Sequence, residues 1–252
     1  MRRFLSILPA VVFCAALASG QTAEELVARN LAAKGGIEKI KAIKSLRITG
    51  NYRQGPFVAS LGQTQKAPNL LRTAITIQGM ALVQAYDGAS GWQINPFEGR
   101  RDPELMGEDD LRDLVFQADF YGPLVDYKEK GNTIEYIGKD TVDGDDAYRL
   151  KVTLKNGDIV YYLLDPDTYL EIRTEVQHFV RGSVRESMSN LGSYKQVNGV
   201  YFPFTVEQGS KRNPGSFSTL TFDKIEANVA IEDQEFKMPA APAAKAKEGS
   251  AK

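Results

Sequence analysis

The chain has 252 residues, with 31 Lys and Arg against 32 Asp and Glu, so its formal net charge is −1 at pH 7. This balance excludes a nucleic-acid-binding protein, which needs a concentrated basic face. One cysteine and one histidine exclude internal disulfides, cysteine metal sites and paired-histidine zinc sites. We expect neither a metal nor a cofactor.

Residues 1–20 have the pattern of a secretory signal peptide. Arg2 and Arg3 precede an apolar run from Phe4 to Leu17, and small residues follow it. The alternative is an uncleaved membrane anchor, which needs about 20 apolar residues. This run is shorter and is interrupted by Pro9. We therefore predict export to the periplasm with cleavage of the signal.

The sequence from residue 21 to residue 239 suits one domain, because all-β domains routinely reach about 200 to 250 residues. Cleavage is expected within residues 18–21, which removes Cys14 and leaves a mature chain without a thiol. The final stretch, Ala240–Lys252, consists mainly of Ala, Pro and Lys and has no large apolar residue. It is predicted to be a disordered tail.

The mature N-terminus, TAEELVARNLAAKGG, predicts a helix. Thr22 and Glu25 have the spacing of a capping box. Leu26, Asn30 and Ala33 fall on one helical face, and a pair of glycines ends the pattern. A shorter helical segment, IEKIKAIKSL, follows directly.

From Ser45 onward the hydrophobic period changes from 3.6 to 2, which indicates strands. The first predicted strand begins at Leu46. The others are Phe57–Gln65, Leu70–Gln78, Met80–Asp87, Gly91–Asn95, Thr133–Lys139, Ala147–Lys155, Asp158–Asp165, Leu170–Val180, Ser183–Tyr194, Val200–Gln208 and Ser216–Ala227. We predict a mainly β fold: an up-and-down antiparallel sheet of about eleven strands, too many to stay flat without curling or closing.

A helical segment, Gly107–Gly122, interrupts the strands after Trp92. Phe116 and Phe120 fall on the side opposite its main apolar stripe, where either a loop covers them or they form a surface for a partner. The stripe, which should face the sheet, consists of Leu111, Leu114, Val115 and Ala118.

Two stretches carry a family resemblance. KAPNLLR, Lys66–Arg72, and YDGASGWQINPF, Tyr86–Phe97, resemble segments of the LolA/LolB periplasmic outer-membrane lipoprotein carriers and lipoprotein-sorting proteins, and weaker similarity spans most of the mature chain. The resemblance implies an incomplete barrel whose mouth is closed by helices around lipid acyl chains. In the carrier itself an Arg that bonds to the lid helices precedes the proline, whereas here Ala67 does. The absence of this Arg puts the carrier's usual lid opening and closing in question for this chain. Lys66 or Arg72 is the candidate to take its role.

Signals for catalysis are few. His178 is either a satisfied interior histidine or a polar point inside a ligand cavity. A hydrolase would have to use His178, and no G-x-S-x-G nucleophile elbow is present. The acidic stretch VDGDDAY lacks the spacing of a calcium-binding EF-hand and is interpreted as a hairpin turn.

Alternating apolar residues on several strands predict an apolar cavity, with a packed core that holds no ligand as the alternative. The predicted lining residues are Leu46, Ile48, Leu71, Ile75, Leu82, Trp92, Val152, Ile172, Phe202 and Phe204. The predicted lid residues are Leu111, Leu114, Val115 and Phe116. Trp92 is expected at the rim between cavity and lid, where its fluorescence would report ligand binding.

We therefore predict a non-enzymatic, monomeric periplasmic carrier that binds lipid or lipoprotein acyl chains. Its partners would be lipoprotein-handling proteins of the inner or outer membrane. The alternative is a periplasmic sensor or scaffold of the same fold, which binds a protein partner without carrying lipid.

Overall fold

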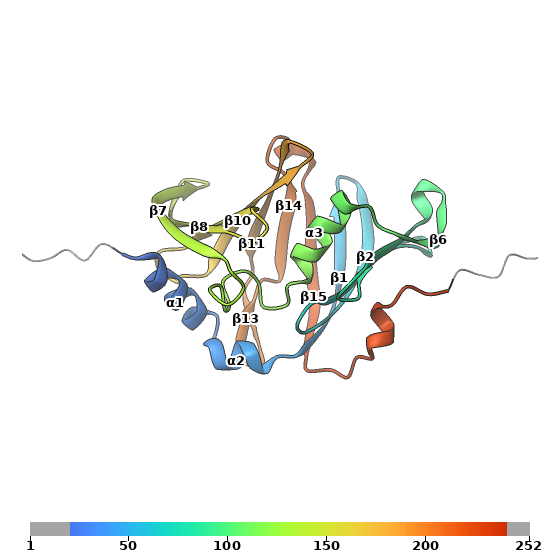
Figure 1. Cartoon of the computed structure of the whole chain (residues 1–252), viewed down its shortest axis with the longest axis horizontal. Helices are drawn as coiled ribbons and strands as arrows, with labels where there is room; N and C mark the ends of the chain where they lie inside the picture. The colour runs from blue at the N-terminus through green and yellow to red at the C-terminus, as the bar shows by residue number, and fades with distance from the viewer. Residues whose placement is uncertain (1–20, 241–252) are drawn as a thin grey trace, which may run out of the picture.

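The computed structural model describes residues 21–240, so the predicted signal peptide with Cys14 and the tail from residue 241 onward lie outside the described residues. The described part forms a 13-stranded antiparallel sheet, a two-stranded sheet and three α-helices (Figure 1). The large sheet curls but does not close, and its two edge strands are unpaired with each other. The predicted mainly β, incomplete barrel is confirmed.

The helices are α1 (Ala23–Ala33), α2 (Ile37–Ala42) and α3 (Glu108–Ala118), and the short 3-10 turns are η1 (Pro96–Glu98), η2 (Pro214–Ser216) and η3 (Asp233–Phe236). The strands are β1 (Ser45–Gln54), β2 (Phe57–Lys66), β3 (Leu70–Ile77), β4 (Met80–Tyr86), β5 (Gly91–Asn95), β6 (Arg100–Leu105), β7 (Thr133–Val142), β8 (Asp145–Thr153), β9 (Ile159–Leu164), β10 (Glu171–Val180), β11 (Ser183–Gly192), β12 (Lys195–Val197), β13 (Val200–Phe202), β14 (Thr205–Ser210) and β15 (Ser218–Ala227).

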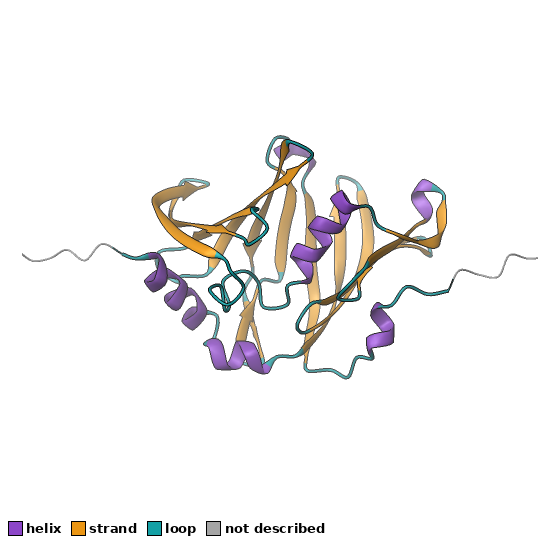
Figure 2. Cartoon of the chain, in the orientation of Figure 1, coloured by secondary structure: helices purple, strands orange, loops and turns teal. Residues whose placement is uncertain are grey.

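The strand order places the first and last strands together in the middle of the sheet. It runs β6-β5-β4-β3-β2-β1-β15-β14-β11-β10-β9-β8-β7. The two edges, β6 and β7, are consecutive strands, and the segment between them carries α3. Figure 2 shows this helix crossing the sheet on the same side as the loops that follow it. The opening of the barrel therefore falls in the middle of the chain, where the helical insertion was predicted.

Two strands were missed by the sequence pattern, β6 and β12, and one predicted strand is split. β6 has the sequence RRDPEL, whose charges and Pro103 are typical of an edge strand. The predicted strand Val200–Gln208 divides into β13 and β14 around Pro203, because proline has no N–H to donate to a ladder.

The inner face of the sheet, defined here as the face that packs against α1 and α3, carries the core in three parts. One part lies under α1, where Leu26 packs with residues of β8, β9 and β10. A second lies under α2 and includes Leu46 and Ile48. The third, under α3, is small: its buried members are Leu71, Leu114 and Ala118.

The N-terminal helix begins as predicted. The Thr22 side chain accepts a hydrogen bond from the Glu25 backbone N–H at 3.1 Å, and the Thr22 N–H donates to the Glu25 carboxylate at 3.2 Å. The predicted capping box is confirmed, and it fixes the start of the helix that covers one half of the sheet.

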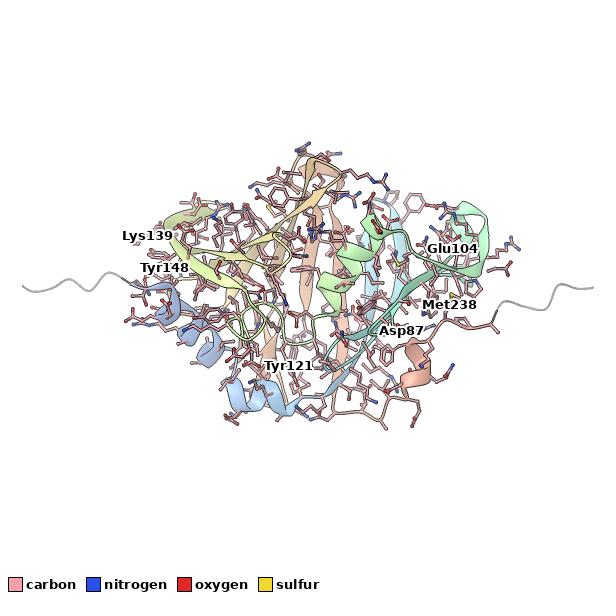
Figure 3. The ribbon with its side chains drawn as sticks, in the orientation of Figure 1. Asp87, Glu104, Tyr121, Lys139, Tyr148 and Met238 are labelled. Atoms are coloured by element: carbon pink, nitrogen blue, oxygen red, sulfur yellow. The ribbon has the colours of Figure 1, made fainter. Side chains whose placement is uncertain are left out.

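The opposite, outer face of the sheet is partly covered by residues 228–239, called the C-terminal strap here. Phe236 in the strap is fully buried, and its carbonyl oxygen accepts a hydrogen bond from Trp92 Nε1 at 2.7 Å. The Lys66 Nζ donates to the Ile231 carbonyl at 3.0 Å and to Asp233 at 2.6 Å. In Figure 3 the labelled Met238 lies near the C-terminal end of the strap.

Candidate ligand-binding site

Most residues predicted to line a cavity share the inner face. The register pairs Leu46 with Gln65 and Gln65 with Leu71, and it pairs Ile75 with Leu82, so these side chains point to one side. Many of them lie within packed core rather than against open space. The predicted lining residues in core clusters are Leu46, Ile48, Leu71, Val152 and Phe204, with Phe202 packed against them and Ile75 and Leu82 half-buried outside the clusters.

Two predicted lining residues lie on the outer face. Trp92 pairs with Ala85, and Ala85 with Arg72, which puts its indole opposite to Leu71 and against the C-terminal strap. Ile172 packs with Val142, Ala147 and Leu163 on the outer side. A register shift between Glu171 and Arg173 removes the strict alternation on which its assignment depended. Trp92 therefore does not lie at the rim between cavity and lid.

Open space on the inner side lies beside α3, in a pocket of about 570 Å³. Three of the four predicted lid residues, Leu111, Val115 and Phe116, line this pocket, while Leu114 packs onto β3. The other lining residues are Glu108 and Arg112 of α3, Asp119, Pro123, Lys130 and Asn132 of the segment that follows α3, and Leu154, Lys155 and Asn156 of the β8–β9 turn. This mostly apolar space is called the lid pocket below.

Phe116 and Phe120, the two phenylalanines left without a role, both point into the molecule. The Phe116 ring meets the His178 ring edge-on, with 5.8 Å between centroids, and Phe120 meets Tyr121 at 5.0 Å. Both rings also pack against the core clusters. The structure therefore matches the first alternative, in which neighbouring segments cover these residues.

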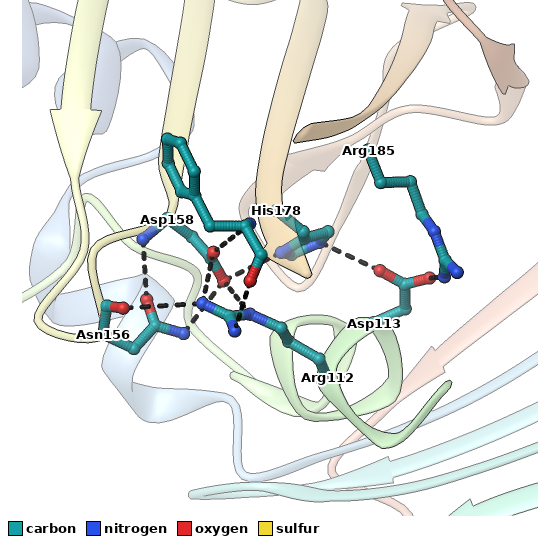
Figure 4. Close-up of polar contacts among 7 residues, drawn as sticks. Arg112, Asp113, Asn156, Asp158, His178 and Arg185 are labelled. Carbon is teal, nitrogen blue, oxygen red and sulfur yellow. Dashed lines mark hydrogen bonds and ion pairs between the residues drawn. The ribbon is translucent and has the colours of Figure 1, made fainter. Parts of the chain in front are cut away.

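α3 is tied to the β8–β9 end of the sheet by a cluster that we call the α3 latch: Arg112 and Asp113 from the helix, Asp158 and His178 from the sheet side (Figure 4). Arg112 donates to both Asp158 oxygens, at 2.8 and 2.6 Å, and to the Phe179 carbonyl at 2.9 Å. Asp158 is 1% exposed. A bidentate pair of this kind fixes the orientation of both groups.

His178 bridges the two parts of the latch. Its Nδ1 lies 2.8 Å from Asp158 Oδ2, and its Nε2 lies 3.0 Å from Asp113 Oδ1. Only the protonated imidazole donates through both nitrogens. Burial lowers the pKa of His178, but the contacts with Asp113 and Asp158 outweigh burial and raise this pKa above its usual value. His178 is thus a satisfied buried histidine, and it joins the helix to the sheet.

Asp158 is held ionised by its partners. Burial raises the pKa of this carboxyl, yet the hydrogen bonds from Arg112, His178 and the Phe179 N–H outweigh burial and hold the pKa below its usual range. Asn156 also donates to Asp158 at 2.9 Å. An ionised, nearly inaccessible carboxylate therefore serves as the fixed anchor for α3.

A second pocket, of about 340 Å³, lies on the other side of Phe116 and was not predicted. Its lining is mostly polar: Gln54, Asp113, Phe116, Gln117, Thr174, Val176, His178, Ser187, Met188, Ser189, Gln208, Gly209, Ser216 and Ser218. We call it the polar pocket. The sequence contains a signal for it, because β10 and β11 carry hydroxyl side chains at inner-face positions, but the alternation of apolar residues does not reveal it.

Within residues 21–240, no three His, Cys, Asp or Glu side chains are grouped so that they could hold a metal ion. The helices of this part of the chain are all too short or too polar to cross a membrane. The lid pocket combines apolar side chains with charged ones such as Lys155, and the polar pocket is lined mainly by uncharged polar side chains.

Neither a protein-family model nor a curated protein matches the sequence, whereas solved structures match the fold. A DUF1329 family protein from Desulfovibrio piger is 14% identical, with a TM-score of 0.57 over 85% of this chain and 97% of the other. A LolA superfamily protein from Nitrosomonas europaea is 12% identical, with a TM-score of 0.56 over 86% and 98%. A putative outer membrane lipoprotein-sorting protein domain from Vibrio parahaemolyticus is 12% identical, with a TM-score of 0.54 over 83% and 97%.

The chain has a LolA-like fold. Within residues 21–240 of this LolA-like fold, neither Lys66 nor Arg72 forms a hydrogen bond or ion pair with α3. Lys66 bonds to the C-terminal strap, and Arg72 lines a groove on the outer face with Trp92. Arg112, which comes from the lid helix itself, provides the connection instead.

The segment after α3 in this LolA-like fold is tied down separately. The Tyr121 hydroxyl, labelled in Figure 3, donates to the Ile43 carbonyl at 3.1 Å, next to the end of α2. Lys130 pairs with Asp119 at 2.6 Å across the same loop. The base of the lid is therefore fixed, while its first turns depend on the latch.

Proposed function

We propose that this protein is a non-enzymatic periplasmic carrier that binds lipid or the acyl chains of a lipoprotein in the lid pocket. The observation that carries the proposal is the apolar space of about 570 Å³ between α3 and the β8–β9 side of an open sheet. Small-molecule sites in proteins have volumes of about 300 to 1,000 Å³ and mostly apolar walls.

Chemistry also supports an acyl ligand. Leu111, Val115 and Phe116 offer apolar surface, and each Å² of apolar surface that leaves water contributes roughly 25 cal/mol. Lys155 also lines this pocket and would suit an ester group near solvent, whereas Lys130 there is already paired with Asp119. Export by the predicted signal peptide would deliver the carrier to the compartment where such ligands pass between membranes.

The direct test is native mass spectrometry of the protein purified from periplasm, combined with lipid extraction. We expect a bound lipid, and we expect the delipidated protein to take up cis-parinaric acid, a fluorescent fatty acid. A protein that carries no lipid and takes up no fatty acid would overturn the carrier proposal and favour the scaffold alternative.

A matched pair of variants locates the ligand. Val115 lines the lid pocket and is 41% exposed, so Val115→Gln should fold normally and weaken fatty-acid binding roughly fivefold. Val58→Gln makes the same change at a 51% exposed site near the β1–β2 turn and should bind normally. Equal affinities for both variants and the unaltered protein would place the ligand elsewhere.

A further inference from the structure

The polar pocket is built by a continuous row of uncharged polar side chains on the inner face. Five neighbouring strands each contribute one residue in register: Thr174 on β10, Ser189 on β11, Gln208 on β14, Ser218 on β15 and Gln54 on β1. All five line the polar pocket. Because side chains alternate between faces, this arrangement requires one hydroxyl or amide at the right position on every strand.

The neighbouring row shows that a polar surface is not a general property of this face. Leu191, Val206 and Leu220 lie next to the polar row on β11, β14 and β15, and they are also in register. Beyond Thr174 the row continues onto β9 at Tyr162, which is buried in the apolar cluster under α1. The polar row is therefore a local feature placed where the sheet is not covered by a helix core.

The row presents hydrogen-bonding groups without net charge. In an antiparallel ladder the backbone groups pair with neighbouring strands, so the hydroxyls of Thr174 and Ser189 can donate to and accept from whatever fills the pocket. The two ionisable lining residues, Asp113 and His178, are engaged with each other at 3.0 Å. An uncharged, hydroxyl-rich group matches this lining better than a phosphate or an ammonium group.

The polar pocket and the lid pocket lie on either side of Phe116, which lines both, so a ligand that occupies both pockets must pass beside this ring. We propose, on the basis of the proposed carrier function, that the ligand is an amphiphile with an uncharged, polyhydroxylated head of sugar type. Its apolar chain lies in the lid pocket and its head lies on the polar row. The polar row thus determines which lipids the carrier accepts.

The experiment uses three amphiphiles with the same eight-carbon chain, each below its micelle concentration: octyl glucoside, octyl sulfate and octyltrimethylammonium. Binding to the mature protein is measured by calorimetry. We expect octyl glucoside to bind at least about tenfold more tightly than the two charged compounds, because several hydrogen bonds to the head are available. Equal affinities, or preference for either charged head, would overturn the inference.

Variants test whether the polar row causes the preference for the glucoside head. The double substitution Thr174→Val with Ser189→Ala should lower the glucoside affinity about tenfold and leave the affinity for octyl sulfate unchanged. Thr219→Val is the matched control, because Thr219 pairs with Glu207 on the outer face of the same sheet. Equal loss for all three amphiphiles in the double variant would argue against head recognition.

These outcomes separate the inference from the proposed function. If the three compounds bind equally and the Val115→Gln variant binds all of them more weakly, the lid pocket holds acyl chains and only the head preference is wrong. If none of the compounds binds, and fatty acid is not taken up either, both the carrier function and the inference are wrong.

Discussion

The two halves of the curled sheet are covered in different ways. On the side of β8 to β10, α1 packs a large apolar cluster with fully buried members such as Leu150 and Val160. On the side of β3 to β5, α3 buries Leu114 and Ala118 against Leu71, and it holds the opposite half through Phe116 and a cluster of charged groups. The first half is a large packed core, whereas the second is closed by a helix with a small buried apolar contact and a charged latch.

The largest expected effect on stability comes from truncating a side chain in the core under α1. Leu150→Ala, at a site with 0% exposure, should lower the free energy of unfolding by about 3 kcal/mol through lost burial and a cavity. Leu114→Ala makes the same change under α3 and should lower it less, because the helix can separate without unfolding the sheet. Urea denaturation measures both. Equal losses would show that α3 is as integral to the fold as α1.

The next effect concerns the latch. Arg112→Gln leaves the buried Asp158 without its main counter-charge, which should cost about 2 to 3 kcal/mol of local stability. Amide hydrogen exchange in α3 should then become faster by at least tenfold, while exchange in α1 stays unchanged. Arg185→Gln is the control, since Arg185 lies 3.4 Å from Asp113 and is half exposed. Faster exchange in both helices would contradict a local latch.

A pH dependence follows from His178. Because the pKa of His178 is raised in the folded protein, its stabilisation of the latch is complete below the ordinary value of 6.5 and is lost as pH rises through the raised value. The pKa of Asp158 is lowered, so its contribution is lost only as pH falls through that lowered value. Arg112 and Arg185, the nearby cations, and Asp113 complete the charged groups around the imidazole.

Exchange of α3 amides, corrected for intrinsic rates, should therefore increase as the pH rises above 6.5 and through the raised pKa of His178. His178→Gln should remove this dependence, because glutamine does not titrate. A pH dependence that persists unchanged in the variant would assign it to another group and leave His178 with a purely packing role beside Phe116.

The smallest effect is spectroscopic. Since the Trp92 indole donates to Phe236 on the outer face, a ligand beside α3 should leave its emission almost unchanged. Truncation after Asn228 removes the strap and should shift the emission to longer wavelength as water reaches the ring. A large change on fatty-acid binding, with the strap intact, would mean that the outer and inner faces are coupled.

Much of the fold could be predicted from local patterns. The bounds of β5 agree with the prediction, α3 lies inside the predicted helical segment, and the capping box of α1 is present. The alternation of strands and the spacing of helices depend only on neighbouring residues, so they can be recognised in the sequence alone. The pairing of β1 with β15 was not predicted, because the local sequence of a strand does not determine which distant strand it pairs with.

The site was predicted less well, for three physical reasons. Alternation fails at a register shift, which moved Ile172 to the outer face. An apolar residue near a strand end says nothing about which face is covered, and Trp92 is covered by the strap. Finally, a search restricted to apolar side chains overlooks hydroxyls such as those of Thr174 and Ser189, although their spacing obeys the same period of two.

The central pairing of β1 with β15 also sets the order of folding. Leu46 lies opposite Ala227, so the middle of the sheet is complete only when almost the whole domain is available. Pairing between such distant segments is slow, because a very long loop must be closed before the contacts form. The hairpins on either side can form early, and we expect the step that joins them into one sheet to come last. A chain that emerges N-terminus first could thus form the β1–β2 hairpin early, but its two halves could be joined only after β15 has emerged.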